Sequence, residues 1–216
     1  NDPNTKFGAP IKGVSNFTLS SYSTIFKGSE ADIKSKSKAF NDKVSKIHRA
    51  LWERINKSSK KDIPAIATYL KLVANHTGHW HKLGAQIFGY TVNPKLRYEY
   101  EHAMPATSAY LYLIDAVLSK NNFNQAYDLV IDNYKLIALD KAEDNKLRKA
   151  GLQRNMPFGW DIVDNFWWQR YFNSSVAKQN NGINPQSIVD LDGNTLQDVF
   201  NINNDGSIHV EGFKPE

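Results

Sequence analysis

The sequence predicts an α+β fold that is predominantly helical, with a small ββα core surrounded by helices. Most apolar residues recur at helical spacing, two short segments have strand-like patterns, and a capped helix follows the second of these segments. We expect an extended N-terminal arm over 1–29 and a helical domain over 30–172 that contains the ββα core at 98–150. A small C-terminal β-hairpin appendage or tail is expected over 173–216.

The N-terminal part of the chain predicts an arm followed by two helices. Residues 1–29 are rich in Pro, Gly, Ser and Thr, which indicates an extended segment with little structure of its own. Glu30–Ile55 has apolar residues at helical spacing and lysines on the other faces, which is typical of an amphipathic helix. A second helix is expected from about Asp62 toward His81, and glycines over 84–89 then break the pattern.

The core segment is predicted as strand, excursion and strand. Large and polar residues alternate over Tyr98–Met104, and Pro105 ends this first strand. Two apolar helices, Ser108–Ser119 and Phe123–Ile131, are expected in the excursion. The run Asn133–Leu139 then predicts a buried second strand.

A helix is predicted directly after the second strand. Asp140, with Glu143 three residues later, forms a capping-box pattern, and Gly151 stands where the C-cap of this helix is expected. Beyond a turn lies the aromatic segment Trp160–Phe172, which we interpret as core or as an interface. The C-terminal region is rich in Asn, Asp and Gly, and its Asp-Gly pairs indicate the hairpin turns of the small β appendage.

The composition limits the classes of function. The chain has no cysteine, which excludes disulfides, thiol redox chemistry and cysteine-ligated zinc. Its formal net charge of +5 permits a polyanionic partner such as nucleic acid. No apolar run reaches the ~20 residues that cross a bilayer and no signal peptide is visible, so we expect no membrane partner and an intracellular or virion-associated location. Because the chain starts at Asn1 without Met, we expect it to be processed or a fragment.

The residues with recognisable chemistry are concentrated in the core segment. Glu101-His102-x-x-Pro105 closes the first strand, Asn133 opens the second, and Asn145 lies one turn into the capped helix. In this order the core segment, roughly a quarter of the chain, resembles the HNH endonucleases, which form the ββα-metal or His-Me finger superfamily. The resemblance implies a hydrolase that cleaves phosphodiester bonds with a divalent cation, Mg²⁺ or Mn²⁺.

The resemblance also implies a role for each of these residues. His102 would be the general base that activates water, because a histidine titrates near neutral pH. Glu101 and Asn145 would be the metal ligands, and Asp144 stays open as a ligand competing with Asn145. Asn133 would accept a hydrogen bond from the second ring nitrogen of His102 and so fix its orientation.

Basic residues near the core would bind the phosphates of the substrate. They are Arg97, Lys146, Arg148 and Lys149. The substrate implied by the resemblance is nucleic acid, with DNA preferred to RNA, and the products would carry a 5′-phosphate and a 3′-hydroxyl.

Other interpretations of the sequence stay open. The chain could be a non-catalytic structural or interaction protein, such as a phage virion or assembly component, with a degenerate nuclease core. A protein partner would then bind through the arm or through Trp160–Phe172. The chain could also be a nuclease toxin whose arm belongs to a delivery region. A separate zinc site is conceivable at three neighbouring histidines, although no carboxylate is near them in the sequence: His76, His79 and His81.

The enzyme hypothesis makes one geometric demand. It requires the side chains of Glu101, His102 and Asn145 to meet at one point. If they lie far apart or inside the apolar core, the enzyme hypothesis fails for these residues, and Glu101 and His102 are an ordinary pair at the end of a strand.

Overall fold

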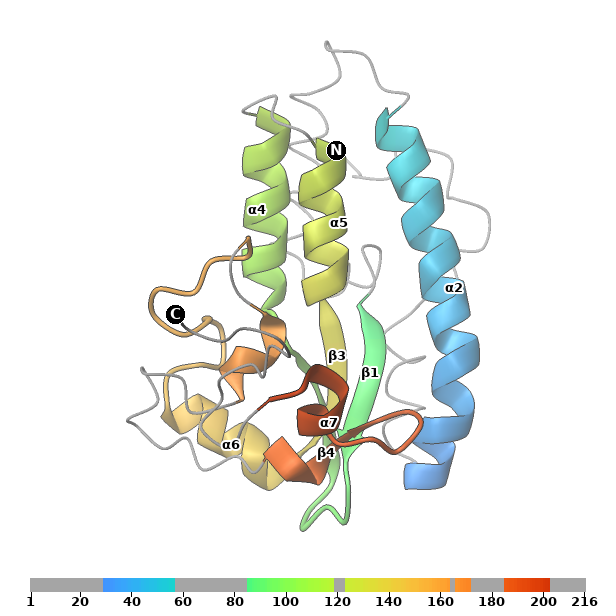
Figure 1. The fold of residues 1–216 in the computed structure, drawn as a ribbon, viewed down its shortest axis with the longest axis vertical. Helices are drawn as coiled ribbons and strands as arrows, with labels where there is room; N and C mark the ends of the chain where they lie inside the picture. Colours follow the sequence, from blue (N-terminus) through green and yellow to red (C-terminus); the bar gives the residue numbers. More distant parts are fainter. Residues whose placement is uncertain (1–28, 57–84, 119–122, 164–165, 172–184, 203–216) are drawn as a thin grey trace, which may run out of the picture.

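A computed structural model gives the fold and describes residues 29–56, 85–118, 123–163, 166–171 and 185–202 (Figure 1). Its helices and strands follow one another in this order: α2 (Glu30–Asn56), β1 (Gln86–Thr91), β2 (Tyr98–His102), α4 (Ala106–Leu118), α5 (Phe123–Asn133), β3 (Lys135–Asp140), α6 (Lys141–Lys149), the 3-10 helices η3 (Trp167–Arg170) and η5 (Pro185–Ser187), β4 (Ile188–Asp190) and α7 (Leu196–Phe200).

The strands form one mixed sheet in the order β2-β3-β1-β4. β3 runs parallel to β1 and antiparallel to β2, and β4 pairs antiparallel with β1. β1 and β2 therefore lie on either side of β3 instead of pairing with each other. As a result, the loop over 92–97 that joins them crosses the end of β3.

A glycine permits the close pairing of β1 with β4. Gly89 lies opposite Asp190, and a Cβ atom at Gly89 would lie 1.8 Å from the backbone oxygen of Val189. The register between β1 and β3 also shifts between Ile87 and Gly89, so the pairing of these two strands is irregular there. The sequence-based interpretation treated the glycines over 84–89 as a break and missed this strand, because a glycine also serves where two backbones approach closely.

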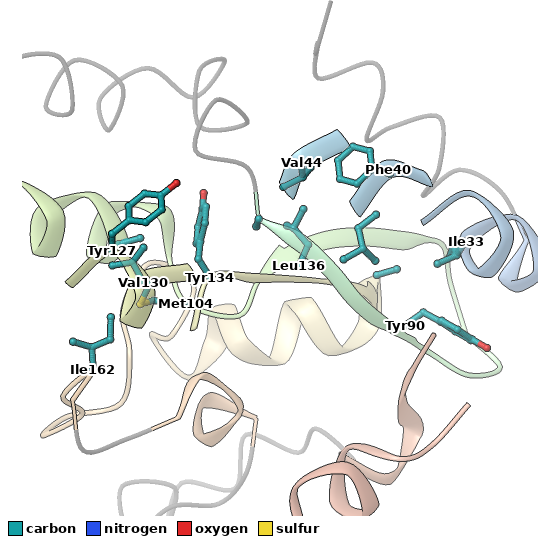
Figure 2. Packing of buried hydrophobic residues seen from close by; sticks show 14 of the residues in the cluster. Ile33, Phe40, Val44, Tyr90, Met104, Tyr127, Val130, Tyr134, Leu136 and Ile162 are labelled. Atoms are coloured by element: carbon teal, nitrogen blue, oxygen red, sulfur yellow. The ribbon is translucent and has the colours of Figure 1, made fainter. Parts of the chain in front are cut away.

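Helix α2 covers one face of the sheet, which we call the helical face, and α4 and α5 pack against each other beyond the end of the sheet where β3 begins (Figure 1). The apolar side chains of these three helices form one buried cluster with Leu136 and Ala138 of β3. Figure 2 shows Phe40 and Val44 of α2 next to Leu136, with Tyr127 and Val130 of α5 beyond the left end of the strands. The buried residues that the three helices contribute are Ile33, Phe40, Val44, Ala109, Leu113, Tyr127 and Val130.

Shorter elements, α6, η3 and α7, cover the opposite face, which we call the α6 face. Ile137 and Leu139 of β3 form a second buried cluster there with Leu147 of α6 and Trp167 and Trp168 of η3. Side chains along a strand alternate between its two sides, so neighbouring residues of β3 belong to different clusters. The buried run predicted as the second strand is therefore confirmed, and both of its faces are covered.

The fold class predicted from the sequence is wrong in its central feature. Among the described residues the fold is roughly α+β, with about 50% helix and about 20% strand, but its core is a four-stranded mixed sheet instead of a small ββα unit surrounded by helices. β2, β3 and α6 were each predicted, yet they are parts of this larger sheet and its cover. β4 was assigned to a separate C-terminal appendage, and it pairs with β1 instead. A three-residue strand carries too short a pattern to be recognised, and its partner lies far away in the sequence.

Local signals set the ends of α6 as predicted. The Asp140 carboxylate accepts a hydrogen bond from a backbone amide of the first turn at 3.1 Å, and Gly151 follows the helix with a φ of 74°. Glu143 does not complete the capping box. Its carboxylate accepts hydrogen bonds from the hydroxyls of Thr91 and Ser187, both at 3.2 Å, and so links α6 to β1 and η5.

Several predicted regions lie outside the described residues. They are the arm up to residue 28, the helix expected toward His81 with its histidine cluster, and the tail over 173–184 and 203–216. Among the helices that the structure describes, none is long and apolar enough to cross a membrane.

Candidate functional site

β2 carries two of the predicted site residues, and the alternation of side chains along the strand separates them. Glu99 and Glu101 contact charged residues of the α6 face. Tyr100 and His102 lie on the helical face, where His102 packs on Tyr134. Because successive residues of a strand point to opposite sides, the structure does not bring Glu101 and His102 together at one point.

Glu101 is paired with a buried arginine. Its Oε1 atom forms an ion pair with Nη1 of Arg170, and the two side chains are 13% and 0% exposed. Burial raises the pKa of Glu101 and outweighs the lowering effect of Arg170. The negative charge of Asp144 raises this pKa further, which places Asp144 within electrostatic range of Glu101.

Arg170 also fixes the backbone around the site. Its guanidinium donates hydrogen bonds to the backbone oxygens of His102 and Ala103 on one side. On the other side it donates to the backbone oxygens of Leu152 and Gln153. A planar guanidinium with several N–H donors suits such a set of acceptors. The end of β2 is thereby tied to the segment that follows α6.

Charged residues of β2 and α6 extend this network toward the surface. Lys141 Nζ lies 2.7 Å from Asp144 Oδ2 and 3.6 Å from Glu99 Oε1. Arg148 Nη2 lies 3.7 Å from the same oxygen of Asp144, and Arg97 Nη2 lies 2.9 Å from Glu99 Oε1. The Asp144 side chain is 9% exposed, so it is largely shielded from water. We call the following residues the carboxylate cluster: Glu99, Glu101, Asp144, Arg97, Lys141, Arg148 and Arg170.

His102, the predicted general base, packs on the helical face. Its ring stacks on Tyr134 with centroids 5.3 Å apart, and it meets Tyr100 edge to face. Burial, together with the nearby charge of Arg170, lowers the pKa of His102 from 6.5 to about 3. The ring is therefore neutral at neutral pH, and a base with so low a pKa is poorly matched to proton abstraction there.

Asn133 ends α5 and does not open β3, because α5 continues past the predicted end of that helix. Its Nδ2 atom donates to the backbone oxygen of Leu129 at 3.0 Å, and its Oδ1 atom accepts from the backbone amide of Trp167 at 2.9 Å. Neither of these bonds involves His102. In the described part of the chain, Asn133 therefore connects α5 to η3 and does not orient the histidine.

Helix α6 presents Asp144, and not Asn145, to the cluster. Glu143, Asp144 and Leu147 are the buried residues of this helix, whereas Asn145 is partly exposed. Asp144, which the sequence left open as a competing ligand, also lies within electrostatic range of Glu101.

The predicted phosphate-binding residues lie on the exposed side of the same elements. Arg97 precedes β2 and is exposed, as are Arg148 and Lys149 near the end of α6, while Lys146 is partly exposed. Within the described ranges, no group of three or more His, Cys, Asp or Glu side chains is arranged to hold a metal ion. A metal ion at the carboxylate cluster would therefore be held by at most two of the described side chains of these types.

Arg170 was not recognised from the sequence. One signal was available, because Arg170 lies within the aromatic segment Trp160–Phe172, which we interpreted as core or as an interface. An arginine that is buried in a core needs a partner. The sequence does not show which carboxylate that partner is. The interpretation of the aromatic segment as core is confirmed for Trp167, Trp168 and Tyr171, which are all buried.

Comparisons with known proteins give no further assignment. No protein-family model matches the chain, and no curated protein and no solved structure is significantly similar to it. The resemblance to the HNH endonucleases therefore stays a prediction from the residues of the core segment.

Proposed function

We propose that this chain is a metal-dependent phosphodiester hydrolase that acts on nucleic acid through the carboxylate cluster. The placement of Glu101 and Asp144 carries the proposal: two largely buried carboxylates from different elements lie within electrostatic range of each other. Lys141 and Arg148 lie against Asp144 on the side toward solvent. Carboxylates for a cation beside basic groups for phosphates are the parts that phosphodiester hydrolysis needs.

Mg²⁺ is the ion that two carboxylates would suit. This ion binds through one or two carboxylates and keeps several waters. Glu101 and Asp144 use Oε1 and Oδ2 for their cationic partners, and within the described contacts Oε2 of Glu101 and Oδ1 of Asp144 are not engaged. When bound, the ion would lower the pKa of a coordinated water and neutralise charge on the scissile phosphate.

The remaining residues of the cluster would position these carboxylates and the substrate. Arg170 holds Glu101 and the end of β2 in place. Lys141 lies between Asp144 and Glu99 and restrains both. Arg148 is half exposed, so it can turn to a phosphate of the substrate, as the resemblance to the HNH endonucleases implies.

Glu101, His102 and Asn145 do not meet at one point, so the geometric demand of the original enzyme hypothesis is not met. This proposal keeps only the reaction class that the resemblance implies and assigns it to other residues. Asp144 replaces Asn145 as the second metal ligand. His102 receives no chemical step, because its ring is neutral and packs on Tyr134. Its role in the proposal is to hold the end of β2 against the helical face.

The competing proposal is that the cluster is a structural ion-pair network in a non-catalytic protein. The pairing of each carboxylate with a cation favours it. The two proposals differ in their response to a divalent cation. A structural network would bind none, whereas a hydrolytic site needs one.

Cleavage of supercoiled plasmid in Mg²⁺, Mn²⁺ or EDTA tests the proposal, for the native chain beside Glu101→Gln and Asp144→Asn. We expect metal-dependent nicking by the native chain. Loss of a residue that hydrogen-bonds to a metal ligand typically lowers metal affinity or activity ~10- to 100-fold. Loss of a ligand itself should therefore lower the cleavage rate by about 100-fold or more. Asp128→Asn, an exposed carboxylate on α5, is the matched control and should cleave at the native rate.

A second measurement does not depend on cleavage. Mg²⁺ should raise the thermal midpoint of the native chain and of Asp128→Asn, because a ligand that binds the folded state stabilises it. It should not raise the midpoint of Asp144→Asn. A folded native chain that neither nicks the plasmid nor responds to Mg²⁺ or Mn²⁺ would establish the structural interpretation of the cluster.

A further inference from the structure

The loop over 92–97, which joins β1 to β2, exposes an apolar side chain between two basic ones. Leu96 is 58% exposed, and its neighbours Lys95 and Arg97 are exposed as well. No acidic residue occurs within the loop. Figure 1 shows the loop, in green, projecting beyond the lower end of the sheet. Leu96 is therefore a large apolar side chain that a projecting loop leaves mostly exposed to solvent.

The backbone of this loop is held by many hydrogen bonds. The Asp140 carboxylate accepts from the backbone amides of Lys95 and Leu96, at 2.8 and 3.1 Å. The backbone amide of Asn93 donates to Glu30 Oε1 at 2.7 Å, and the backbone oxygen of Arg97 accepts from the amide of Lys141 at 2.9 Å. The loop is therefore anchored to α2, β3 and α6, so Leu96 is presented in a fixed position.

The loop adjoins the carboxylate cluster. Arg97 pairs with Glu99, and Glu99 lies 3.6 Å from Lys141, which in turn pairs with Asp144. The Arg97 side chain is 77% exposed. An ion pair this exposed contributes little to stability, so Arg97 can leave Glu99 for a phosphate at little cost.

We propose that the 92–97 loop is a binding element for duplex DNA, which enters a groove with Leu96 as an apolar wedge while Lys95 and Arg97 contact the flanking phosphates. The proposal rests on the proposed function for its substrate class and narrows that class to double-stranded DNA. Proteins that bind the minor groove commonly insert aliphatic side chains between base steps and contact the backbone with basic residues. A loop that is fixed before binding suits this mode, since little ordering remains to be done on binding.

The composition of the loop favours a duplex over a single strand. Proteins that bind single strands stack the bases on aromatic side chains, and the loop has none. Its basic residues precede and follow the leucine in the sequence, so one is available for each of the two backbones that border a groove.

Fluorescence anisotropy tests the proposal, with a labelled DNA duplex of about 20 base pairs, roughly two helical turns, and the same strand unpaired. Binding is measured in EDTA to prevent cleavage, over a range of salt concentrations. We expect Lys95→Ala/Arg97→Ala to weaken duplex binding by ~10-fold or more. The slope of log binding constant against log salt concentration should become shallower by about 2, one for each phosphate that the variant no longer neutralises. Leu96→Ser should weaken binding of the duplex but not of the single strand.

Lys34→Ala/Lys38→Ala is the matched control, because it removes the same charge from exposed positions of α2. We expect it to bind the duplex nearly as the native chain does. If both double variants lose affinity equally, net charge explains the effect and the loop has no special role. If Leu96→Ser binds the duplex normally, or lowers binding of both forms of DNA equally, the wedge is disproved. All substituted side chains are exposed, so the variants should fold.

The loop proposal and the proposed function can each be disproved without the other. A native chain that binds duplex DNA through the loop but never cleaves it would disprove hydrolysis and leave the loop assignment intact. A chain that cleaves DNA at the native rate after substitution of Lys95, Leu96 and Arg97 would disprove the loop assignment and leave hydrolysis intact.

Discussion

The two faces of the sheet differ in what they bury. On the helical face, α2, α4 and α5 supply a large apolar cluster, and the histidine of β2 packs there in its neutral form. On the α6 face, a smaller cluster rich in aromatic residues lies beside the ion pair of Glu101 and Arg170. Adjacent residues of one strand, Glu101 and His102, therefore experience opposite environments. Glu101 and His102 are adjacent in the predicted motif, and the sheet places their side chains on opposite faces.

The difference has an energetic consequence. Burying neutral groups such as the His102 ring against Tyr134 costs little once they are packed. Burying the charges of Glu101 and Arg170 costs several kcal/mol per ion in desolvation, which their pairing and their hydrogen bonds must offset. Stability on the α6 face should therefore depend on individual charged residues, whereas stability on the helical face is spread over many contacts.

The largest expected effect is that of Arg170→Met. It leaves the Glu101 carboxylate and the backbone oxygens of His102, Ala103, Leu152 and Gln153 without their donor. Breaking a buried ion pair by removing one partner costs about 3–5 kcal/mol, and urea denaturation would show this loss of unfolding free energy. Arg148→Met, at the exposed edge of the cluster, should cost less than about 1 kcal/mol. Similar losses for both variants would contradict the contrast between buried and exposed charge.

An intermediate effect is expected for His102→Phe, which keeps a ring against Tyr134 but removes any acid–base chemistry. We expect the variant to fold with a loss of about 1–3 kcal/mol, because the core must accommodate a somewhat larger ring. Plasmid nicking by this variant should stay within a few-fold of the native rate. Complete loss of nicking from a stable protein would restore His102 as the general base and would mean that the site draws on both faces.

The smallest expected effect is that of Asp32→Asn at the start of α2. Hydrogen bonds from Lys36 and Ser29 lower the pKa of Asp32 from its ordinary value of 3.8 to about 2, although the carboxylate is exposed. Because the folded pKa lies below the unfolded one, this stabilisation is present above pH ~4 and is lost as the pH falls toward 2. The variant should melt slightly below the native chain at neutral pH, and the difference should vanish in acid. A difference that persists below pH 2 would show that charge is not its cause.

Much of the secondary structure could be predicted because it depends on local patterns. The apolar spacing of α2, the alternation in β2, the buried run of β3 and the cap of α6 at Asp140 are each set by residues within a few positions of one another. β1 and β4 could not be predicted in this way. Gly89 looked like a break until its close approach to Val189 was seen, and β4 is too short to carry a pattern.

The candidate site could be predicted only in part for the same reason. The sequence by itself determined that Glu101 stands near the end of a strand and that Asp144 lies in a capped helix, and it left Asp144 open as a ligand. Only the tertiary structure decided that Arg170 reaches Glu101, that Asn133 binds Trp167 and that His102 faces the other side of the sheet. Local propensity is encoded by near neighbours. The partners of a buried charge are chosen by strand pairing and helix packing among residues that are far apart in the sequence.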